Sequence, residues 1–212
     1  HDPRLAWGFY GHRLEQYRAI DPHPGYHILR DWCQAREHAI FTSNVDGHFA
    51  AVGFAPERIC EVHGSIHHLQ CTLACSSAIW SAEAHRPAID AATLHETGPL
   101  PRCPACRALA RPNILMFGDA AWIPDRSHLQ ELRHEQFLHR MHRARLVVVE
   151  CGAGTAVPTV RQHGEWIARE HGARVIRINP HEAQIGGEHA VGLALGAHAA
   201  LQAIDEAMMR LF

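Results

Sequence analysis

The fold class of this chain is decided by the segment Arg145-Leu146-Val147-Val148-Val149-Glu150, which runs into Cys151-Gly152-Ala153-Gly154-Thr155. The first half is a short apolar run rich in valine and predicts a buried strand, while the glycines of the second half predict a turn. A helical pattern follows at residues 159–171, and another apolar run lies at residues 173–178. Strand, helix and strand in this order predict a βαβ unit, in which the two strands lie parallel.

Further elements are predicted on the N-terminal side of this unit. Helical spacing of apolar residues predicts helices, and short apolar runs predict strands. The predicted helices cover residues 5–19, 25–36 and 127–143, and the predicted strands cover residues 39–42, 58–62 and 114–117. Because near-continuous apolar strands are typical of sheets that are covered on both sides, we predict an α/β fold: a Rossmann-like parallel sheet with helices on both faces.

Two pairs of cysteines interrupt this alternation. Cys71 and Cys75 form the first pair, and Cys103 and Cys106 follow after 27 intervening residues. Four thiolates fill every position around a tetrahedral zinc ion and leave none for water, so we predict a structural zinc site. Two disulfides are the alternative, but the odd total of seven cysteines and the lack of secretory features favour a reducing compartment.

The cysteine pairs also indicate how the chain divides. From residue 66 to residue 111 the apolar periodicity weakens, and proline, serine and cysteine become frequent. We therefore predict a small inserted zinc-ribbon module at residues 66–111. The larger, Rossmann-like domain is predicted to combine residues 1–65, which begin with a helical segment, and residues 112–212.

Composition narrows the classes of function. The formal net charge of −2 is unlike the basic surface of most nucleic-acid-binding proteins. No apolar run approaches the roughly 18 residues of a membrane span, and no signal peptide opens the chain. We therefore expect a cytoplasmic protein that binds neither nucleic acids nor membranes. Because the first residue is His1 and not methionine, we also expect a fragment of a longer protein.

Polar residues collect at the predicted carboxyl ends of the strands. They are Asn44, Asp46, His63, the loop of Gly152, Gly154 and Thr155, and Asn179. In open α/β sheets, ligands bind in the crevice outside the carboxyl ends of the strands. These positions therefore predict a ligand site at one edge of the sheet.

Each of these residues also has a purely structural interpretation. The loop at 152–155 can present backbone N–H groups to an anion such as a phosphate, but many strand-to-helix turns need glycine for their geometry alone. Asn44 and Asp46 can orient an amide or a ribose, or they can cap a helix. His63, followed by Gly64, can act as a general base near neutral pH, although a lone histidine is more often structural.

The order of the motifs resembles the sirtuin family of NAD-dependent protein deacylases. The segment at residues 42–47 is similar to the family's Thr-Gln-Asn-Ile-Asp-Gly motif, His63-Gly64 matches its catalytic His-Gly, and the four cysteines match its zinc module. Residues 111–119 resemble its Arg-Pro-Asp…Phe-Gly-Glu segment, and residues 175–179 resemble a strand whose last residue, asparagine, meets the adenosine ribose. Five motifs in the correct order are far more specific than any one of them.

The resemblance implies an activity and a role for each matching residue. The chain would be a protein lysine deacylase that uses NAD and releases nicotinamide and O-acyl-ADP-ribose, with His63 as the general base. Asn44 and Asp46 would line the nicotinamide pocket, and the 152–155 loop and Asn179 would contact the rest of NAD. Phe117 and Gly118 would pair with the acyl-lysine peptide as an added strand.

A further match concerns the acyl group. Tyr10 and Arg13 lie where some sirtuins carry a Tyr-x-x-Arg pair, and on a helix they share one face. Because arginine binds carboxylates through two parallel hydrogen bonds, this pair would suit succinyl- or malonyl-lysine. The alternative is an amphipathic helix with a surface arginine.

The chain also departs from the family pattern. The family's N-terminal strand and its glycine-rich loop, which grips the NAD pyrophosphate, have no match, so we expect an N-terminally truncated chain that binds NAD poorly. Ser43 replaces a glutamine, the first cysteine pair has one extra spacer residue, and the 152–155 loop replaces a Gly-Thr-Ser turn. These departures leave three alternatives to deacylation: protein ADP-ribosyl transfer, NAD hydrolysis, and peptide binding by an inactive module.

Overall fold

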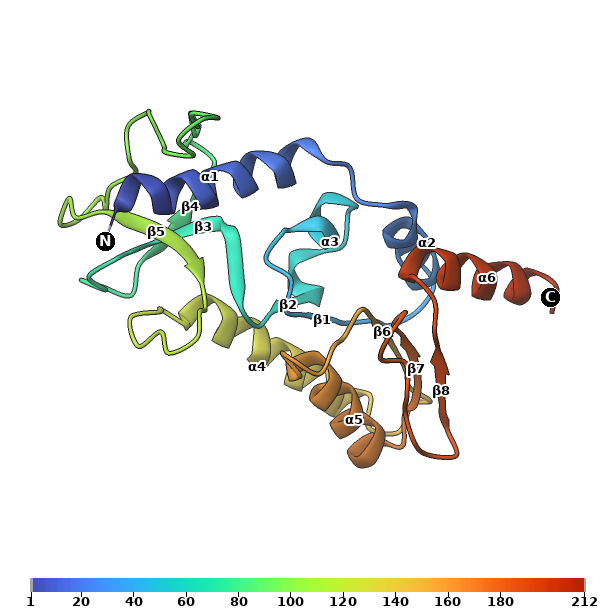
Figure 1. The fold of residues 1–212 in the computed structure, drawn as a ribbon. Coiled ribbons are helices and arrows are strands. Elements are labelled where there is room, and N and C mark those ends of the chain that lie inside the picture. The colour runs from blue at the N-terminus through green and yellow to red at the C-terminus, as the bar shows by residue number, and fades with distance from the viewer. Residues whose placement is uncertain (1, 212) are drawn as a thin grey trace.

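The computed structural model describes residues 2–211, and Figure 1 shows its mixed α/β architecture. In chain order the elements are α1 (Pro3–Ala19), α2 (Pro24–Cys33), β1 (Ile40–Thr42), α3 (His48–Ala51), a 3-10 turn (Pro56–Arg58), β2 (Ile59–Glu61), β3 (Gly64–Cys71), β4 (Ile79–Ser81), β5 (Ala110–Ile114), α4 (Asp125–Arg140), β6 (Val147–Cys151), α5 (Thr159–His171), β7 (Arg174–Ile178), β8 (Ala190–Leu193) and α6 (Ala197–Met209). Among the described residues, no helix is long and apolar enough to cross a membrane.

The βαβ unit predicted from residues 145–178 is confirmed. Strands β6 and β7 pair in parallel, with Val147 opposite Arg174, and β8 extends this sheet in the order β6-β7-β8. Helix α5 has the predicted bounds, and it ends at Gly172, whose φ of 62° is the left-handed conformation that glycine adopts without strain. Strand β8 and helix α6 were not predicted, because the segment from 190 to 209 is rich in alanine and has weak periodicity.

A second parallel sheet contains β1 and β2, which pair from Ile40 opposite Ile59 to Thr42 opposite Glu61. The predicted strands at 39–42 and 58–62 are therefore present, and both shorten slightly at their ends. Two predicted helices also end early, α2 at Cys33 and α4 at Arg140. In both cases the last residues of the predicted helix form turns instead. After α4, for example, the Ala144 amide donates a hydrogen bond to the Met141 carbonyl (2.8 Å).

The third sheet is antiparallel, in the order β4-β3-β5, and carries the cysteine pairs. The prediction of a strand at 114–117 was wrong, since β5 covers residues 110–114 and ends there. The reason is its partner: β3 begins at Gly64 opposite Ile114, so the chain beyond Ile114 has no strand to pair with. It turns outward instead and leaves Phe117 94% exposed.

Gly64 is required where β3 starts. Its φ is 80°, and a Cβ at this position would overlap the carbonyl oxygen of Asn113 on β5. Only glycine permits both this backbone conformation and this close approach of the two strands. The glycine of the predicted His-Gly motif therefore joins the third sheet directly behind His63.

A buried ionic network joins the β6-β7 sheet to α5. Arg177 is 1% exposed and donates to the Glu150 carboxylate (Nε to Oε2, 2.5 Å) and to Glu165 on α5 (Nη2 to Oε1, 2.9 Å). Gly164 packs against the same carboxylate, and a Cβ there would overlap Glu150 Oε1. Because Glu150 is tied to Arg177, it cannot move aside without leaving a buried charge unpaired.

We therefore expect Gly164→Ala to destabilise the protein by about 1–3 kcal/mol, the usual cost of overpacking a core. This loss would come in spite of the ~1 kcal/mol that alanine gains over glycine inside a helix. Urea unfolding measures the change. Gly186→Ala is the matched control, because no atom lies within 4 Å of its Cβ position. Equal stability of the two variants would contradict the expectation.

Candidate functional site

The register of β1 and β2 brings two of the predicted motifs to the same edge. Thr42 lies opposite Glu61, and the Val62 amide donates to the Thr42 carbonyl (3.0 Å). Asn44 and His63 each follow these paired residues by two positions. Because the strands are parallel, both residues leave the sheet at its carboxyl end, as the sequence predicts.

Asn44 and Asp46 line a small cavity of about 50 Å³ at this edge. The turn that carries them is held by local bonds: the Asn44 amide donates to Thr42 Oγ1 (3.1 Å), and the His48 amide donates to Asp46 Oδ1 (3.0 Å). The complete lining is Thr42, Asn44, Asp46, Gly47, His48, Phe49, Ala50, Pro56, Ile59, Glu61, Arg126 and Gln130. We call this space the amide cavity.

Two residues of the amide cavity, Arg126 and Gln130, come from α4 and were missed in the sequence. Arg126 forms an ion pair with Glu61, and Gln130 Oε1 accepts the Glu61 amide (3.0 Å). Ser127 on the same helix donates to the Glu61 carbonyl (2.8 Å). The signal was available: polar residues at 127, 130 and 134 recur at helical spacing, so they share a face of α4 and need partners if that face is buried.

Two polar atoms on residues that line the amide cavity have no hydrogen-bond partner among residues 2–211. They are Arg126 Nη1, which is a donor, and His48 Nε2, whose role as donor or acceptor depends on the tautomer. Buried polar atoms are rarely left unpaired, because each costs the free energy of its lost hydration. Together with the Asn44 amide and the Asp46 carboxylate, they form a donor and acceptor set that fits a carboxamide.

His63 follows Glu61, a residue of the amide cavity wall, by two positions and is not itself part of the wall. Its Nε2 is 3.4 Å from Thr159 Oγ1, at the first turn of α5, and its carbonyl accepts the Leu115 amide (2.9 Å). Burial lowers the pKa of the imidazole below its ordinary value of 6.5. A neutral imidazole is the form that accepts a proton, so this environment suits a general base.

The loop at residues 152–155 already holds an anion from its own chain. The Thr155 amide donates to Glu182 Oε2 (2.9 Å), and the Thr155 hydroxyl donates to the same carboxylate. These bonds lower the pKa of Glu182. One backbone amide of the loop and one hydroxyl thus bind a carboxylate, while phosphate binding by this loop stays a prediction.

Asn179 is also committed to backbone groups in this structure. Its Oδ1 accepts the amides of His181 and Glu182 (both 2.9 Å), and its Nδ2 donates to the Ala153 carbonyl (3.2 Å). Asn179 thus fixes the segment that places Glu182 on the 152–155 loop. The structure brings these two predicted elements together, through a contact that the sequence did not indicate.

Tyr10 and Arg13 lie on α1 but do not contact each other's polar groups. The Tyr10 hydroxyl donates to Met116 Sδ (2.8 Å), next to Phe117, while Arg13 Nη1 donates to the Tyr17 hydroxyl (2.8 Å). Burial raises the pKa of Tyr10. The contact with Met116 places Tyr10 against the exposed segment that contains Phe117 and Gly118.

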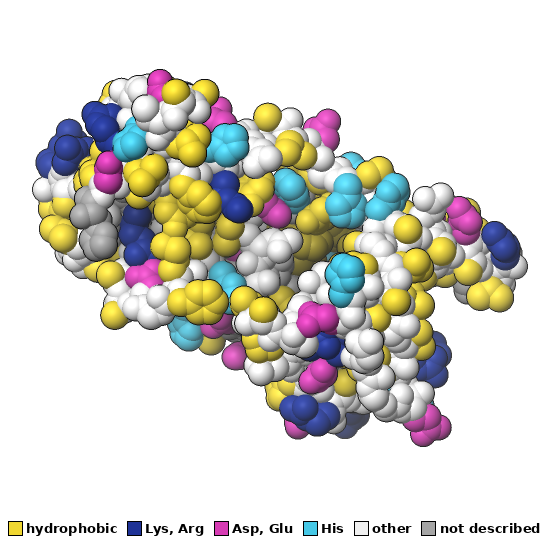
Figure 2. Space-filling view, in the orientation of Figure 1, with side chains coloured by type: hydrophobic (Ala, Val, Ile, Leu, Met, Phe, Trp, Pro, Cys, Tyr) yellow, Lys and Arg dark blue, Asp and Glu magenta, His cyan; other side chains and the backbone are white. Residues whose placement is uncertain are grey.

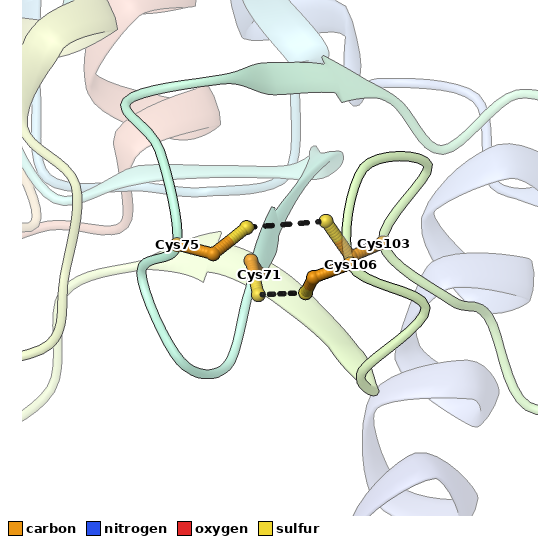
Figure 3. A group of neighbouring side chains, drawn as sticks. All are labelled: Cys71, Cys75, Cys103 and Cys106. Carbon is orange, nitrogen blue, oxygen red and sulfur yellow. Dashed lines mark hydrogen bonds between the residues drawn. The ribbon is translucent and has the colours of Figure 1, made fainter.

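The four cysteines converge as the sequence predicts, and Figure 3 shows their sulfur atoms facing one another. Cys71 Sγ lies 3.6 Å from Cys106 Sγ, and Cys75 Sγ lies 3.6 Å from Cys103 Sγ. All four sulfurs lie within 4.8 Å of one another. Tetrahedral zinc with bonds of about 2.3 Å holds sulfur atoms about 3.8 Å apart, so the cluster fits this ion.

Backbone amides support this cluster. The amide of Cys106 is the main donor that lowers the pKa of the Cys103 thiol to about 7, and the amide of Cys75 lowers the pKa of Cys71. The extra spacer residue of the first pair is accommodated by Ala74, whose φ of 43° is left-handed. Thiolates are the form that binds zinc, so each loop offers one thiolate that is stabilised by a backbone amide. The neighbouring thiols raise the pKa of Cys75 to about 12, a repulsion that a bound cation would relieve.

Figure 2 shows several histidine side chains exposed along the middle of one face, around a group of hydrophobic side chains. Two histidines near Asp46 have structural partners: His48 packs edge-on against Tyr26, with ring centroids 5.7 Å apart, and His67 Nε2 lies 2.8 Å from the Asp46 carbonyl. Both help to shape the wall that carries Asp46.

Comparison with known proteins gives consistent matches. The model of the Sir2 family matches residues 1–155. An NAD-dependent protein deacylase of Pyrococcus furiosus is 31% identical over 84% of this chain and 64% of its own length. One of Aquifex aeolicus is 26% identical over 87% of this chain and 68% of its own length. The chain thus spans about two thirds of the length of these curated relatives.

Solved structures share the fold. A Sir2 homologue in complex with NAD superimposes with a TM-score of 0.70 at 21% identity, covering 99% of this chain and 73% of the other. A complex described as Sir2, p53 peptide and NAD+ gives a TM-score of 0.61 at 20% identity, covering 94% and 79%. These scores confirm the predicted α/β architecture.

Proposed function

Because the chain belongs to the Sir2, or sirtuin, family, we propose that it is an NAD-dependent protein lysine deacylase that releases nicotinamide and O-acyl-ADP-ribose. The observation that supports this most directly is the amide cavity beside His63. Its polar wall contains Asn44 and Asp46, together with the unpaired Arg126 Nη1 (unpaired within residues 2–211). Nicotinamide carries a carboxamide, the group that this donor and acceptor set fits.

Each residue then has a defined task. Asp46 accepts the N–H of the carboxamide, and Asn44 or Arg126 donates to its oxygen, which orients the nicotinamide ring. When bound, NAD supplies the leaving nicotinamide and the ADP-ribose that receives the acyl group. His63 takes up the proton of a ribose hydroxyl at Nε2, because its lowered pKa keeps that nitrogen free near neutral pH.

The remaining NAD contacts are proposed for the 152–155 loop and Asn179. Glu182 now occupies the amide and hydroxyl of Thr155, so a phosphate at this loop must displace its carboxylate. Asn179 Oδ1 is occupied by two backbone amides, whereas Nδ2 has a second N–H that can donate to a ribose hydroxyl. We propose that binding of NAD opens this contact between the loop and the segment at 179–182.

The acyl-lysine substrate is proposed to lie along residues 115–118. Phe117 is 94% exposed, and the chain there has left its sheet. The Leu115 amide and the Met116 and Gly118 carbonyls already have backbone partners, so the added strand would pair through Phe117. Tyr10 touches this segment through Met116. Arg13 lies one turn further along α1 and is proposed to recognise an acidic acyl group.

The zinc cluster is proposed to be structural, because four thiolates leave no position for water or substrate. A reduced thiolate cluster also agrees with a cytoplasmic location, which we propose for the protein.

The proposal is tested by incubating the protein with NAD and matched acetyl-lysine and succinyl-lysine peptides, and by identifying the products by mass spectrometry. O-acyl-ADP-ribose together with free lysine peptide is the expected result. Nicotinamide release without deacylated peptide would point to ADP-ribosyl transfer or NAD hydrolysis, and no consumption of NAD would point to a peptide-binding module. Arg13→Gln is expected to lower turnover of the succinyl peptide more than that of the acetyl peptide.

A further inference from the structure

A larger cavity, of about 290 Å³, lies at the opposite end of β1 and β2 from the amide cavity. It opens where the two strands begin, beside Ala39 and Ile59, and α4 forms its other side. Its lining is Ala39, Glu57, Arg58, Ile59, Cys60, Gln130, Arg133, His134, Gln136, Phe137 and Arg140. We call it the basic pocket, and the proposed deacylase chemistry uses none of its arginines.

Three arginines and one carboxylate give the basic pocket its charge. Arg58 is partly neutralised by Glu37, outside the pocket (Nη1 to Oε2, 2.9 Å). Arg133 and Arg140 have no ion-pair partner anywhere in the stretch from residue 2 to residue 211. Glu57 is the single acidic residue in the lining, so three guanidinium groups there face one carboxylate, and Glu37 offsets part of the remaining positive charge.

The guanidinium groups are held in place by an aromatic ring. The Cζ atoms of Arg58 and Arg140 lie 5.8 Å and 6.0 Å from the centroid of the Phe137 ring. Arg133 is held by a bond from its Nε to the Leu129 carbonyl (3.2 Å). Positions 133 and 140 are seven apart on α4, and so they project from the same face. Fixed guanidinium groups lose less side-chain entropy when an anion binds.

The inner wall of the basic pocket combines apolar side chains with one buried imidazole. Ile59 and Phe137 are 6% and 7% exposed and provide an apolar surface. His134 is 8% exposed; its Nε2 lies 2.9 Å from His163 Nε2, and its Nδ1 has no partner within the described part of the chain. Burial lowers the pKa of His134 to about 4, so the imidazole is neutral and the charge of the pocket comes from the arginines.

We propose that the basic pocket binds a small organic anion, whose phosphate group pairs with a guanidinium group of the lining, that of Arg133 or Arg140, and whose apolar body lies against Ile59 and Phe137. Guanidinium groups form paired, charge-assisted hydrogen bonds with phosphate and carboxylate, which neutral ligands cannot make. The volume admits a ligand of the size of a substituted ring. The basic pocket shares Ile59 and Gln130 with the amide cavity, but Arg58, Arg133 and Arg140 line only the basic pocket, and the proposal does not depend on the proposed activity.

The test is a titration of the protein with phenyl phosphate in which the NMR chemical shifts of the backbone amides are recorded. Saturable shifts are expected at residues 57–60 and 130–140, below about 10 mM ligand. A parallel titration with benzoate compares the affinity for a carboxylate with the affinity for a phosphate. We expect benzoate to bind more weakly because it carries one negative charge. Phenol has the same ring without the charge and is expected not to saturate.

The double variant Arg133→Gln/Arg140→Gln is expected to weaken binding of phenyl phosphate about tenfold or more. Both arginines are exposed, so their replacement leaves the core unchanged. Arg169→Gln, at an exposed position on α5, removes a charge outside the pocket and is expected to change the affinity less than about twofold. An equal loss in both variants, saturation by phenol, or shifts confined to the amide cavity would overturn the proposal.

Discussion

His63→Ala is expected to lower the rate of acyl-lysine removal by about 10²- to 10⁴-fold, the usual contribution of a positioned general base. The imidazole lies at the carboxyl end of β2, beside the cavity lined by Asn44 and Asp46, and it is partly buried against Thr159. Because alanine removes only a side chain outside the wall of that cavity, nicotinamide affinity is expected to change little. Rates of deacylation by mass spectrometry and nicotinamide binding by calorimetry measure the two effects.

The control for this variant is His128→Ala. His128 lies on α4, and its side chain is 65% exposed. Its replacement therefore controls for any effect of removing a histidine that is not part of the site. Deacylation by this variant is expected to match that of the unaltered protein. A His63→Ala variant that retains more than about a tenth of the rate would exclude proton transfer by this residue.

The same residue predicts the pH dependence. Burial favours the neutral imidazole, so the pKa of His63 lies below 6.5. A general base is active when deprotonated, and activity is therefore expected to persist as the pH falls to 6.5 and to drop only at lower pH. The pH profile of kcat/KM in the free enzyme reports this pKa. A midpoint above 6.5 would contradict the assigned environment.

Cys103→Ala is expected to abolish zinc binding and to unfold the segment around both cysteine pairs. Zinc bound by such sites contributes about 10–16 kcal/mol of apparent free energy to small zinc-finger domains, far more than the interactions of a short loop segment supply. Cys103 is 1% exposed, so its loss removes one of the two buried ligands, and Cys71 is the other. Metal analysis and hydrogen exchange at residues 71–75 and 103–107 measure the two consequences.

The effect is expected to reach the candidate active site. Strand β3 begins at Gly64, next to His63, and ends at Cys71, and β5 pairs with both of its ends, on either side of an irregularity between Ser65 and Leu69. Loss of the zinc cluster therefore loosens the strand that fixes His63. Cys33→Ala is the matched control, because Cys33 is a half-buried free cysteine outside the cluster. A Cys103→Ala variant with one zinc per chain would show that the quartet is not the metal site.

Local sequence patterns predicted the elements whose signal lies in consecutive or regularly spaced residues. Strand β6 contains three consecutive valines, and the four cysteines have a spacing with few alternative meanings. The strand is less buried than predicted, since Val147 at its start is 57% exposed. Strand β3 was missed because it alternates polar and apolar residues without regularity. Gln70 is fully buried there, and its side chain is satisfied by Asn113 and by the Ile123 amide, 43 and 53 residues away. No local pattern can reveal partners at such separations.

The site shows the same division. Asn44, Asp46 and His63 were found because they follow strands, and strand ends are visible in the sequence. Arg126 and Gln130 reach the same cavity from α4, and their inclusion depends on how that helix packs against Glu61. The Glu182 contact with the 152–155 loop was also missed, since 27 residues separate Thr155 from its partner.

Ile59 and Gln130 line both the amide cavity and the basic pocket, so the two spaces have a common wall. Gln130 is fixed in that wall by the Glu61 amide, two residues before His63. A ligand that displaces this wall from one cavity therefore alters the shape of the other cavity. By thermodynamic linkage, bound nicotinamide changes the affinity for the anion by the same factor by which the bound anion changes the affinity for nicotinamide. If the wall is rigid, this factor is one.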